Sequence, residues 1–195
     1  MERLQAQVGF ILEADKLKQI LRQTLVSGGE GRRENDAEHS WHLGLMALLL
    51  REYAAEPVDL LRVVEMLLVH DLVEIDAGDT FVYDEAAHQD KEEREQKAAA
   101  RIFGLLPADQ AERVRGLWTE FEARQTPEAR FAAALDRYQP LLLNFATQGA
   151  AWRRHGIRRA QVVERNRHME EGAPALWAAA SELIEEAVRR GWILP

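Results

Sequence analysis

The chain has 195 residues, of which 47% are hydrophobic and 30% charged, with no cysteine and a formal net charge of -8 at pH 7. This composition fits one folded globular domain and excludes an intrinsically disordered chain. The missing cysteines exclude disulfides and cysteine-ligated zinc sites, and the acidic balance argues against a nucleic-acid polymer as partner.

The N-terminal segment MERLQAQVGFILEADKLKQ lacks the basic region and the following apolar region of a signal peptide. No apolar run in the chain approaches the roughly 20 residues that cross a bilayer. We therefore expect a cytoplasmic protein that does not contact a membrane.

Apolar residues recur at helical spacing along almost the whole chain, and no segment shows the alternation of a strand. Glycine-rich loops and proline-led helix starts separate the periodic segments. The sequence therefore predicts a single all-α domain over residues 1–195, a bundle of about six to seven helices. The expected helices span roughly 4–24, 37–54, 58–76, 88–105, 108–124, 127–147 and 158–190, the last interrupted near 172–174.

Three of these helices carry ionisable side chains where the pattern predicts the protein core. The helix at 58–76 is apolar nearly all round, which is typical of a buried central helix. A buried carboxylate is costly unless it is paired, hydrogen-bonded or bound to a metal. The side chains concerned are His39, His70, Asp71, Glu74 and Asp136.

Two interpretations of these residues are open. Taken singly, each is most simply a core group that hydrogen-bonds to a carbonyl. Taken together, two imidazoles and two carboxylates from three helices have the make-up of a four-ligand metal site in a helical bundle. His70 and Asp71 are neighbours that point about 100° apart, which suits a cation set deep between helices.

Three segments together resemble the HD-domain metal-dependent phosphohydrolases, whose pattern is His, then His-Asp, then Asp. The segments are ENDAEHSWH (34–42), HDLVEIDAGD (70–79) and ALDRY (134–138). The closer similarity is to the 5'-deoxynucleotidase-like branch of that family. The resemblance gives a domain core of about 10–147 and leaves 148–195 as a helical C-terminal extension.

The resemblance implies one divalent metal ion, for which Mn, Co, Fe, Ni, Zn and Mg all suit ligands without sulfur. It also implies a catalytic acidic pair, Glu74 and Asp79, with Glu74 as general base or proton shuttle one turn after His70. A metal ion held by two histidines and two aspartates keeps open coordination positions for a water molecule and a phosphate oxygen. The implied metal ligands are His39, His70, Asp71 and Asp136.

The segment LKQILRQT (17–24) resembles the part of the family in which an arginine near the end of the first helix contacts the substrate phosphate. That arginine falls on Arg22, whose planar guanidinium suits bidentate phosphate binding. The alternative is a surface ion pair between Arg22 and Glu30 or Glu34. Some relatives place a tryptophan after this arginine, associated with discrimination of deoxyribose from ribose, but this chain has Gln23.

The implied function is removal of the 5'-phosphate from a deoxynucleoside or ribonucleoside monophosphate. One alternative is an HD hydrolase that acts on another phosphate ester or on a nucleoside triphosphate. The other is a non-catalytic regulatory module that binds a nucleotide or a metal, although the presence of Glu74 and Asp79 favours an enzyme. The resemblance also implies a homodimer.

Overall fold

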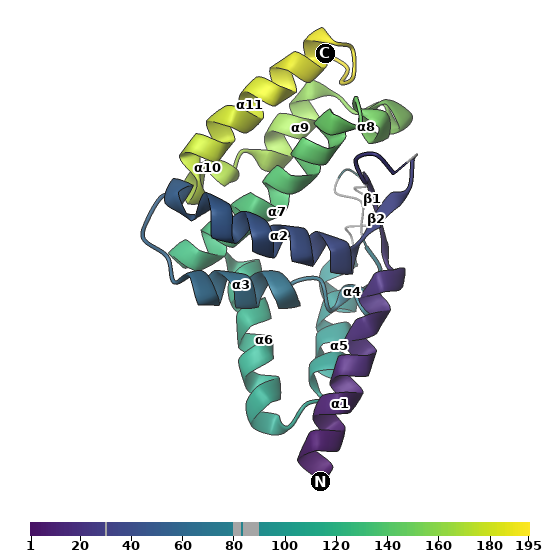
Figure 1. The fold of residues 1–195 in the computed structure, drawn as a ribbon, viewed down its shortest axis with the longest axis vertical. Coiled ribbons are helices and arrows are strands. Elements are labelled where there is room, and N and C mark those ends of the chain that lie inside the picture. Colours follow the sequence, from purple (N-terminus) through teal and green to yellow (C-terminus); the bar gives the residue numbers. More distant parts are fainter. Residues whose placement is uncertain (30, 80–82, 84–89) are drawn as a thin grey trace.

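The computed structural model describes residues 1–29, 31–79, 83 and 90–195. These residues form eleven α-helices and a two-stranded antiparallel sheet (Figure 1). The strands are β1 (Leu21–Leu25) and β2 (Arg33–Asn35), and short 3-10 helices span Asp15–Gln19 and Arg51–Tyr53. The helices are α1 Glu2–Ala14, α2 Asp36–Leu50, α3 Leu60–Val69, α4 Glu74–Ala77, α5 Lys91–Phe103, α6 Ala108–Ala123, α7 Pro127–Ala146, α8 Ala150–His155, α9 Arg159–Asn166, α10 Met169–Gly172 and α11 Pro174–Arg189.

Helix α7 runs through the middle of the molecule and organises the packing (Figure 1). Helices α2 and α3 cross it, α1, α5 and α6 extend toward the N-terminal end, and α8 to α11 gather at the C-terminal end. Thr126 caps α7 by accepting a hydrogen bond from the Ala129 amide, and Pro127 occupies the first turn. Its Phe131 and Leu135 side chains are fully buried in the main hydrophobic core.

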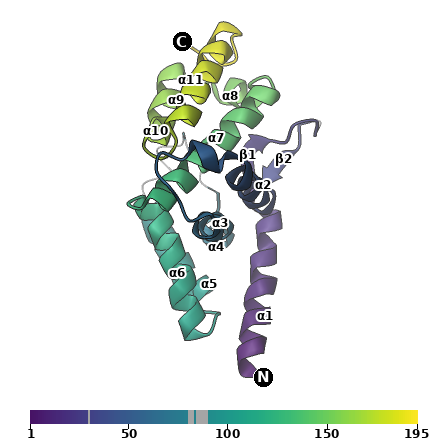
Figure 2. The same ribbon diagram turned by 60° about the vertical axis from the view of Figure 1, so that its left-hand side comes forward.

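A second, smaller core lies where α5 and α6 pack beneath α4, and it contains Phe103 and Trp118. Helices α1 and α6 diverge from the N-terminal end of the molecule (Figure 2), where Arg3 of α1 lies 2.8 Å from Asp109 at the start of α6. None of the residues of α1 is buried. Among the described residues, no helix combines the length and hydropathy that crossing a membrane requires.

The first helix predicted over 4–24 is α-helical to Ala14 and continues as a 3-10 helix to Gln19, so the prediction is wrong from Ile20 onward. The prediction that strands are absent is also wrong. Residues Leu21–Leu25 pair antiparallel with Arg33–Asn35, and the glycine-rich connection between them uses positive φ at Gly28 and Gly31. The strands are too short to show clear alternation, and they are stabilised by pairing with a distant segment that local periodicity does not reveal.

The helix count also exceeds the predicted six to seven, because two predicted helices are divided and α8 lies between two of the predicted helices. The one expected over 58–76 ends at Val69, turns at His70, and resumes as α4. The one expected over 158–190 is divided into α9, α10 and α11, with the interruption near 172–174 as predicted. A Cβ on Gly172 would collide with the backbone of Arg130, so this break allows α10 to approach α7 closely.

Candidate active site

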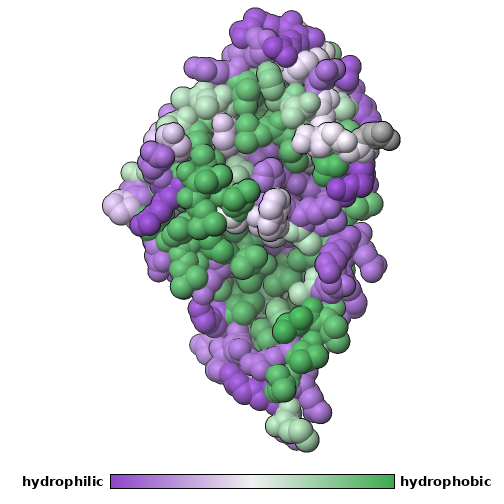
Figure 3. All heavy atoms as spheres, viewed as in Figure 1, coloured by the Kyte–Doolittle hydropathy of each residue, from purple (hydrophilic) through white to green (hydrophobic). Residues whose placement is uncertain are grey.

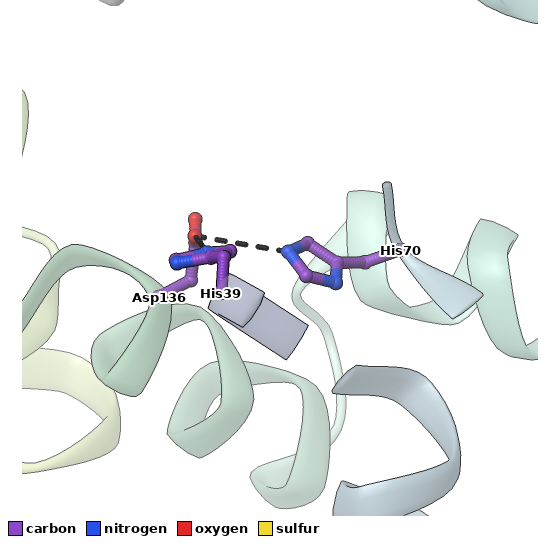
Figure 4. A group of neighbouring side chains, drawn as sticks. All are labelled: His39, His70 and Asp136. Carbon is purple, nitrogen blue, oxygen red and sulfur yellow. Dashed lines mark hydrogen bonds and ion pairs between the residues drawn. The ribbon is translucent and has the colours of Figure 1, made fainter. Parts of the chain in front are cut away.

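Three of the predicted ligands meet in the centre of the molecule (Figure 4). Asp136 Oδ1 of α7 lies 2.9 Å from His39 Nε2 and 3.8 Å from His70 Nε2. Ligand atoms of all three residues lie within 4.8 Å of one another, and all three are buried. His39 is positioned in the first turns of α2, whose start is set by a capping box between Asn35 and Glu38.

The ring of His70 is oriented by the end of α3. Its Nδ1 lies 2.9 Å from the Leu67 carbonyl oxygen, which can only accept, so Nδ1 carries a proton and donates. The Nε2 atom therefore faces the cluster, and it has no hydrogen-bond partner among the described residues. Backbone bonding of one ring nitrogen is the usual arrangement of a metal-binding histidine, so this orphaned atom fits a cation.

Asp71 approaches the same centre from the turn after α3. Its Oδ2 atom lies 3.1 Å from His70 Nε2 and 2.9 Å from Arg22 Nη1. The structure thus brings all four predicted ligands, His39, His70, Asp71 and Asp136, into one cluster.

Arg22 projects from β1 into this cluster and is not on the surface. Besides Asp71, it lies 3.4 Å from Asp36, 3.8 Å from Glu34 and 4.0 Å from Asp136. Burial alone would lower the pKa of Arg22, but the surrounding carboxylates hold it well above its usual value. Of the two surface partners considered for this arginine, Glu34 is close but buried, and residue 30 lies outside the described residues.

Sequence reasoning missed two acidic residues of the cluster, Glu34 and Asp36. Asp36 is fully buried, and its carboxylate, with those of Asp71 and Glu74, forms a second group whose oxygens lie within 4.8 Å. Acidic residues at the start of a helix are common because they complement the helix dipole. The ENDAEH stretch therefore gave no sign that its first and third residues are buried.

The carboxylates of the cluster fall into two electrostatic classes. Burial raises the pKa of Glu74 well above its ordinary value, and the neighbouring charges of Asp71 and Asp36 act in the same direction. Burial also opposes ionisation of Asp71, but His70 and Arg22 outweigh it and lower the pKa of that carboxyl. The site therefore pairs a fixed anion with a carboxyl suited to proton exchange.

The charge on His70 follows from the same balance. Burial lowers the pKa of His70, but Asp71 and Asp136 raise it to about 10. The surrounding carboxylates thus favour a positive charge at Nε2, which a proton supplies and which a divalent cation would supply in its place.

Asp79 follows Gly78, which ends α4 with a φ of 76°. The positive φ of Gly78 reverses the chain at the end of α4. Asp79 then lines the same cavity as His70 and Glu74. Burial raises the pKa of Asp79, although Arg22 opposes that shift.

The cavity extends beyond the ligand cluster into the C-terminal part of the fold. Its far wall includes Asn144 of α7, Trp152 of α8 and Asn166 of α9. Trp152 and Asn166 lie beyond residue 147, where the resemblance read from the sequence ends, and no motif in the sequence marked Asn144 as a site residue.

Comparison with known proteins shows that the resemblance to the HD-domain family continues beyond residue 147. The HD domain family model matches residues 14–177. The human protein 5'-deoxynucleotidase HDDC2 is 29% identical over 133 residues, which is 68% of this chain and 64% of the human protein. The chain thus spans less than two thirds of the length of that relative. The Schizosaccharomyces pombe protein 5'-deoxynucleotidase hdd1 is 24% identical over 95% of this chain and 86% of its own length.

A solved structure resembles the whole chain. The crystal structure of a predicted metal-dependent phosphohydrolase from Magnetospirillum magnetotacticum MS-1 has a TM-score of 0.94 and 59% sequence identity. The alignment covers 100% of this chain and 97% of that one.

Proposed function

The chain belongs to the HD-domain family, in its 5'-deoxynucleotidase-like branch, and from this premise we propose that it removes the 5'-phosphate from deoxynucleoside monophosphates. The observation that carries the proposal is the convergence of two imidazoles, two carboxylates and a buried arginine at one end of a cavity. The substrate class comes from the relatives named 5'-deoxynucleotidases. We further propose that residues 1–195 act as one domain in the cytoplasm.

In this proposal the two histidines and the two aspartates hold one divalent cation. The cation would polarise the phosphoryl group and lower the pKa of a water molecule. The orphaned Nε2 of His70 supports this ligand set. The proposed ligands are His39, His70, Asp71 and Asp136.

Glu74 is the proposed proton carrier of the reaction. Glu74 is 8% exposed and lines the cavity, and its Oε2 atom has no hydrogen-bond partner among the described residues. A buried carboxyl with a raised pKa can accept a proton from the attacking water and release it afterwards. Asp79, on the same cavity wall, is proposed to orient that water.

Arg22 is the proposed phosphate-binding group. Its Nη1 atom makes the contacts to Asp71 and Asp36, whereas Nε has no hydrogen-bond partner among the described residues. A guanidinium has five N–H donors in a planar fork, so donors remain for a phosphate oxygen while Nη1 holds the carboxylates.

A metal-supplemented phosphatase screen over ribo- and deoxynucleoside mono-, di- and triphosphates tests the proposal. We expect the deoxynucleoside monophosphates to be hydrolysed fastest. Faster release of phosphate from nucleoside triphosphates or from other phosphate esters would instead support an HD hydrolase with that other substrate. Binding of nucleotide and metal without release of phosphate would support the regulatory module.

We also propose that the chain forms a homodimer through an apolar face made by α1, α2 and α3. Figure 3 shows this face as largely hydrophobic. Its exposed side chains are Leu4, Val8, Ile11 and Leu12 on α1, Trp41, Leu45, Leu48 and Leu49 on α2, and Leu61 and Leu68 on α3.

The size of this face supports a second copy as the occupant. Full burial of one such side chain removes roughly 60–120 Å² from water. Because these side chains are 40–67% exposed, together they offer about 350–700 Å², which at its upper end is most of the ~800 Å² per partner of a standard interface. Monomers rarely expose apolar patches of more than a few hundred Å². An apolar face also meets its own copy without like-charge repulsion, as a two-fold dimer requires.

The oligomeric state tests this interface. We expect light scattering to give a dimer for the unaltered chain and a monomer for Leu49→Lys. The matched control is Leu194→Lys, since Leu194 is also exposed but lies at the C-terminal end. A monomeric unaltered chain, or a Leu49→Lys dimer, would contradict the proposal.

A further inference from the structure

The far end of the candidate active-site cavity contains residues that the proposed reaction leaves without a role. We propose that Asn144 and Trp152 form a binding site for the planar base of the substrate. This inference rests on the proposed function, because it assumes that a phosphate occupies the end of the cavity where Arg22 and the ligand cluster lie.

The first support is the spacing along α7. Asp136, Pro140 and Asn144 are four residues apart, so they occupy successive turns on one side of the helix, and all three line the cavity. Eight residues of helix advance about 12 Å. A molecule anchored by its phosphate beside Asp136 therefore needs an extended organic part to reach Asn144, and the sugar and base of a nucleotide provide one.

The second support is an unpaired buried acceptor. The Nδ2 atom of Asn144 donates to the Pro140 carbonyl at 2.9 Å, which fixes the orientation of the amide. Its Oδ1 atom has no hydrogen-bond partner among the described residues, although Asn144 is only 7% exposed. Buried acceptors are normally satisfied, so a ligand with an N–H donor is expected at this end of the cavity.

The third support is the apolar wall beside that acceptor. Trp152 is 2% exposed and lines the cavity together with Pro140 and Leu141. These three side chains give this end of the cavity an apolar wall, against which the weakly hydrated rings of a nucleobase fit better than a charged group does.

The position of Trp152 is fixed by the packing of the C-terminal extension. Helix α8 begins after Gly149 at a φ of 68°, where a Cβ would press against Trp192 near the C-terminus. The Ile157 amide donates to the Trp152 carbonyl at 3.0 Å just after α8 ends. The segment from 148 to 195, which lies outside the resemblance read from the sequence, thus completes the cavity.

This arrangement predicts weak selectivity among bases. Each of the four common bases has either an exocyclic amino group or a ring N–H that could donate to Asn144 Oδ1. One acceptor and one apolar wall therefore favour substrates that have a base over substrates that lack one, but do not discriminate among the four bases.

The test compares deoxyadenosine monophosphate with 2-deoxyribose 5-phosphate, which has the phosphate and the sugar but no base. For Asn144→Ala we expect kcat/KM on the nucleotide to fall roughly 5- to 150-fold, the range for one buried hydrogen bond, mainly through KM. For Trp152→Leu we expect a fall of similar size, because the smaller side chain leaves a gap in the apolar wall of the cavity. Neither variant should change kcat/KM on 2-deoxyribose 5-phosphate. Trp118→Phe is the matched control, since Trp118 is buried in the smaller core away from the cavity, and it should change neither value.

Equal losses on both substrates, or no loss on either, would overturn the inference while leaving the proposed function intact. Failure of the unaltered protein to hydrolyse any phosphate monoester would instead refute the proposed function. In that case calorimetry with deoxyadenosine, which lacks the phosphate, decides the inference. Binding that Asn144→Ala weakens supports a base site, and absent or unaltered binding rejects it.

Discussion

Replacing Arg22 with alanine should destabilise the fold as well as impair catalysis. The guanidinium lies 2.9 Å from Asp71 and 3.4 Å from Asp36, and its side chain is only 14% exposed. Removing one partner of a buried ion pair costs about 3–5 kcal/mol, because the other charge remains buried without compensation. Asp36 can relieve part of this cost by taking a proton, since burial and the charge of Asp71 raise its pKa to about 7. We therefore expect Arg22→Ala to lower the free energy of unfolding by the amount for one buried ion pair, and not by a multiple of that amount.

Thermal unfolding in the presence of a chelator measures this loss. A change of 1 kcal/mol shifts Tm by about 2–4 °C in a chain of this size, so Arg22→Ala should lower Tm by about 6–20 °C. Arg32→Ala is the matched control, because Arg32 makes an exposed ion pair with Glu38 and such pairs contribute about 0–1 kcal/mol. Adding a divalent metal should raise the Tm of Arg22→Ala more than that of the unaltered chain. If both variants unfold at the same temperature, the buried guanidinium does not stabilise these carboxylates.

Three further outcomes are expected. Elemental analysis should find about one divalent metal per chain, and chelation of that metal should abolish hydrolysis. The Asp71→Ala variant should lose both its bound metal and part of its stability. Glu74→Gln should keep its metal and fold while kcat falls by about 10²–10⁴, and near-normal turnover would remove Glu74 from the proton-transfer role. Burial, assisted by Arg137 and Arg124, lowers the pKa of His168 from 6.5 to about 4. Protonation therefore favours the unfolded chain, so stability should fall as pH drops from about 6.5 toward 4. Urea titrations should find a smaller fall in His168→Gln, and identical pH profiles would contradict this assignment.

The ligand cluster could be predicted from the sequence because each member disturbs a strong local pattern. His39 lies on an apolar stripe of a helix, and Asp136 interrupts another apolar helix. An ionisable group inside such a pattern indicates a buried partner or cation whatever the tertiary structure. The resemblance to a known family then assigned these residues to one site, and the structure places them within reach of each other.

The surroundings of the cluster depended on contacts that local patterns do not record. Arg22 was expected at the end of a helix but lies on β1, because that segment pairs with residues 33–35. The same pairing directs Glu34 and Asp36 inward, although the sequence there reads as an ordinary capped helix start. The role of Trp152 also depends on tertiary packing, since α8 is positioned by Trp192 about forty residues later.

The two mistaken expectations about the N-terminal region have a common cause that bears on the site. A helix continued through Arg22 would have required only local hydrogen bonds, whereas the hairpin brings a cation among the carboxylates of three other segments. Without Arg22, the carboxylates of Asp36 and Asp71 would face each other. Among the described residues, only His70 would then place a basic side chain within 4 Å of either carboxylate. Because the hairpin supplies the positive charge that the acidic cluster needs, we infer that folding of β1 against β2 and assembly of the proposed metal-binding cluster are coupled.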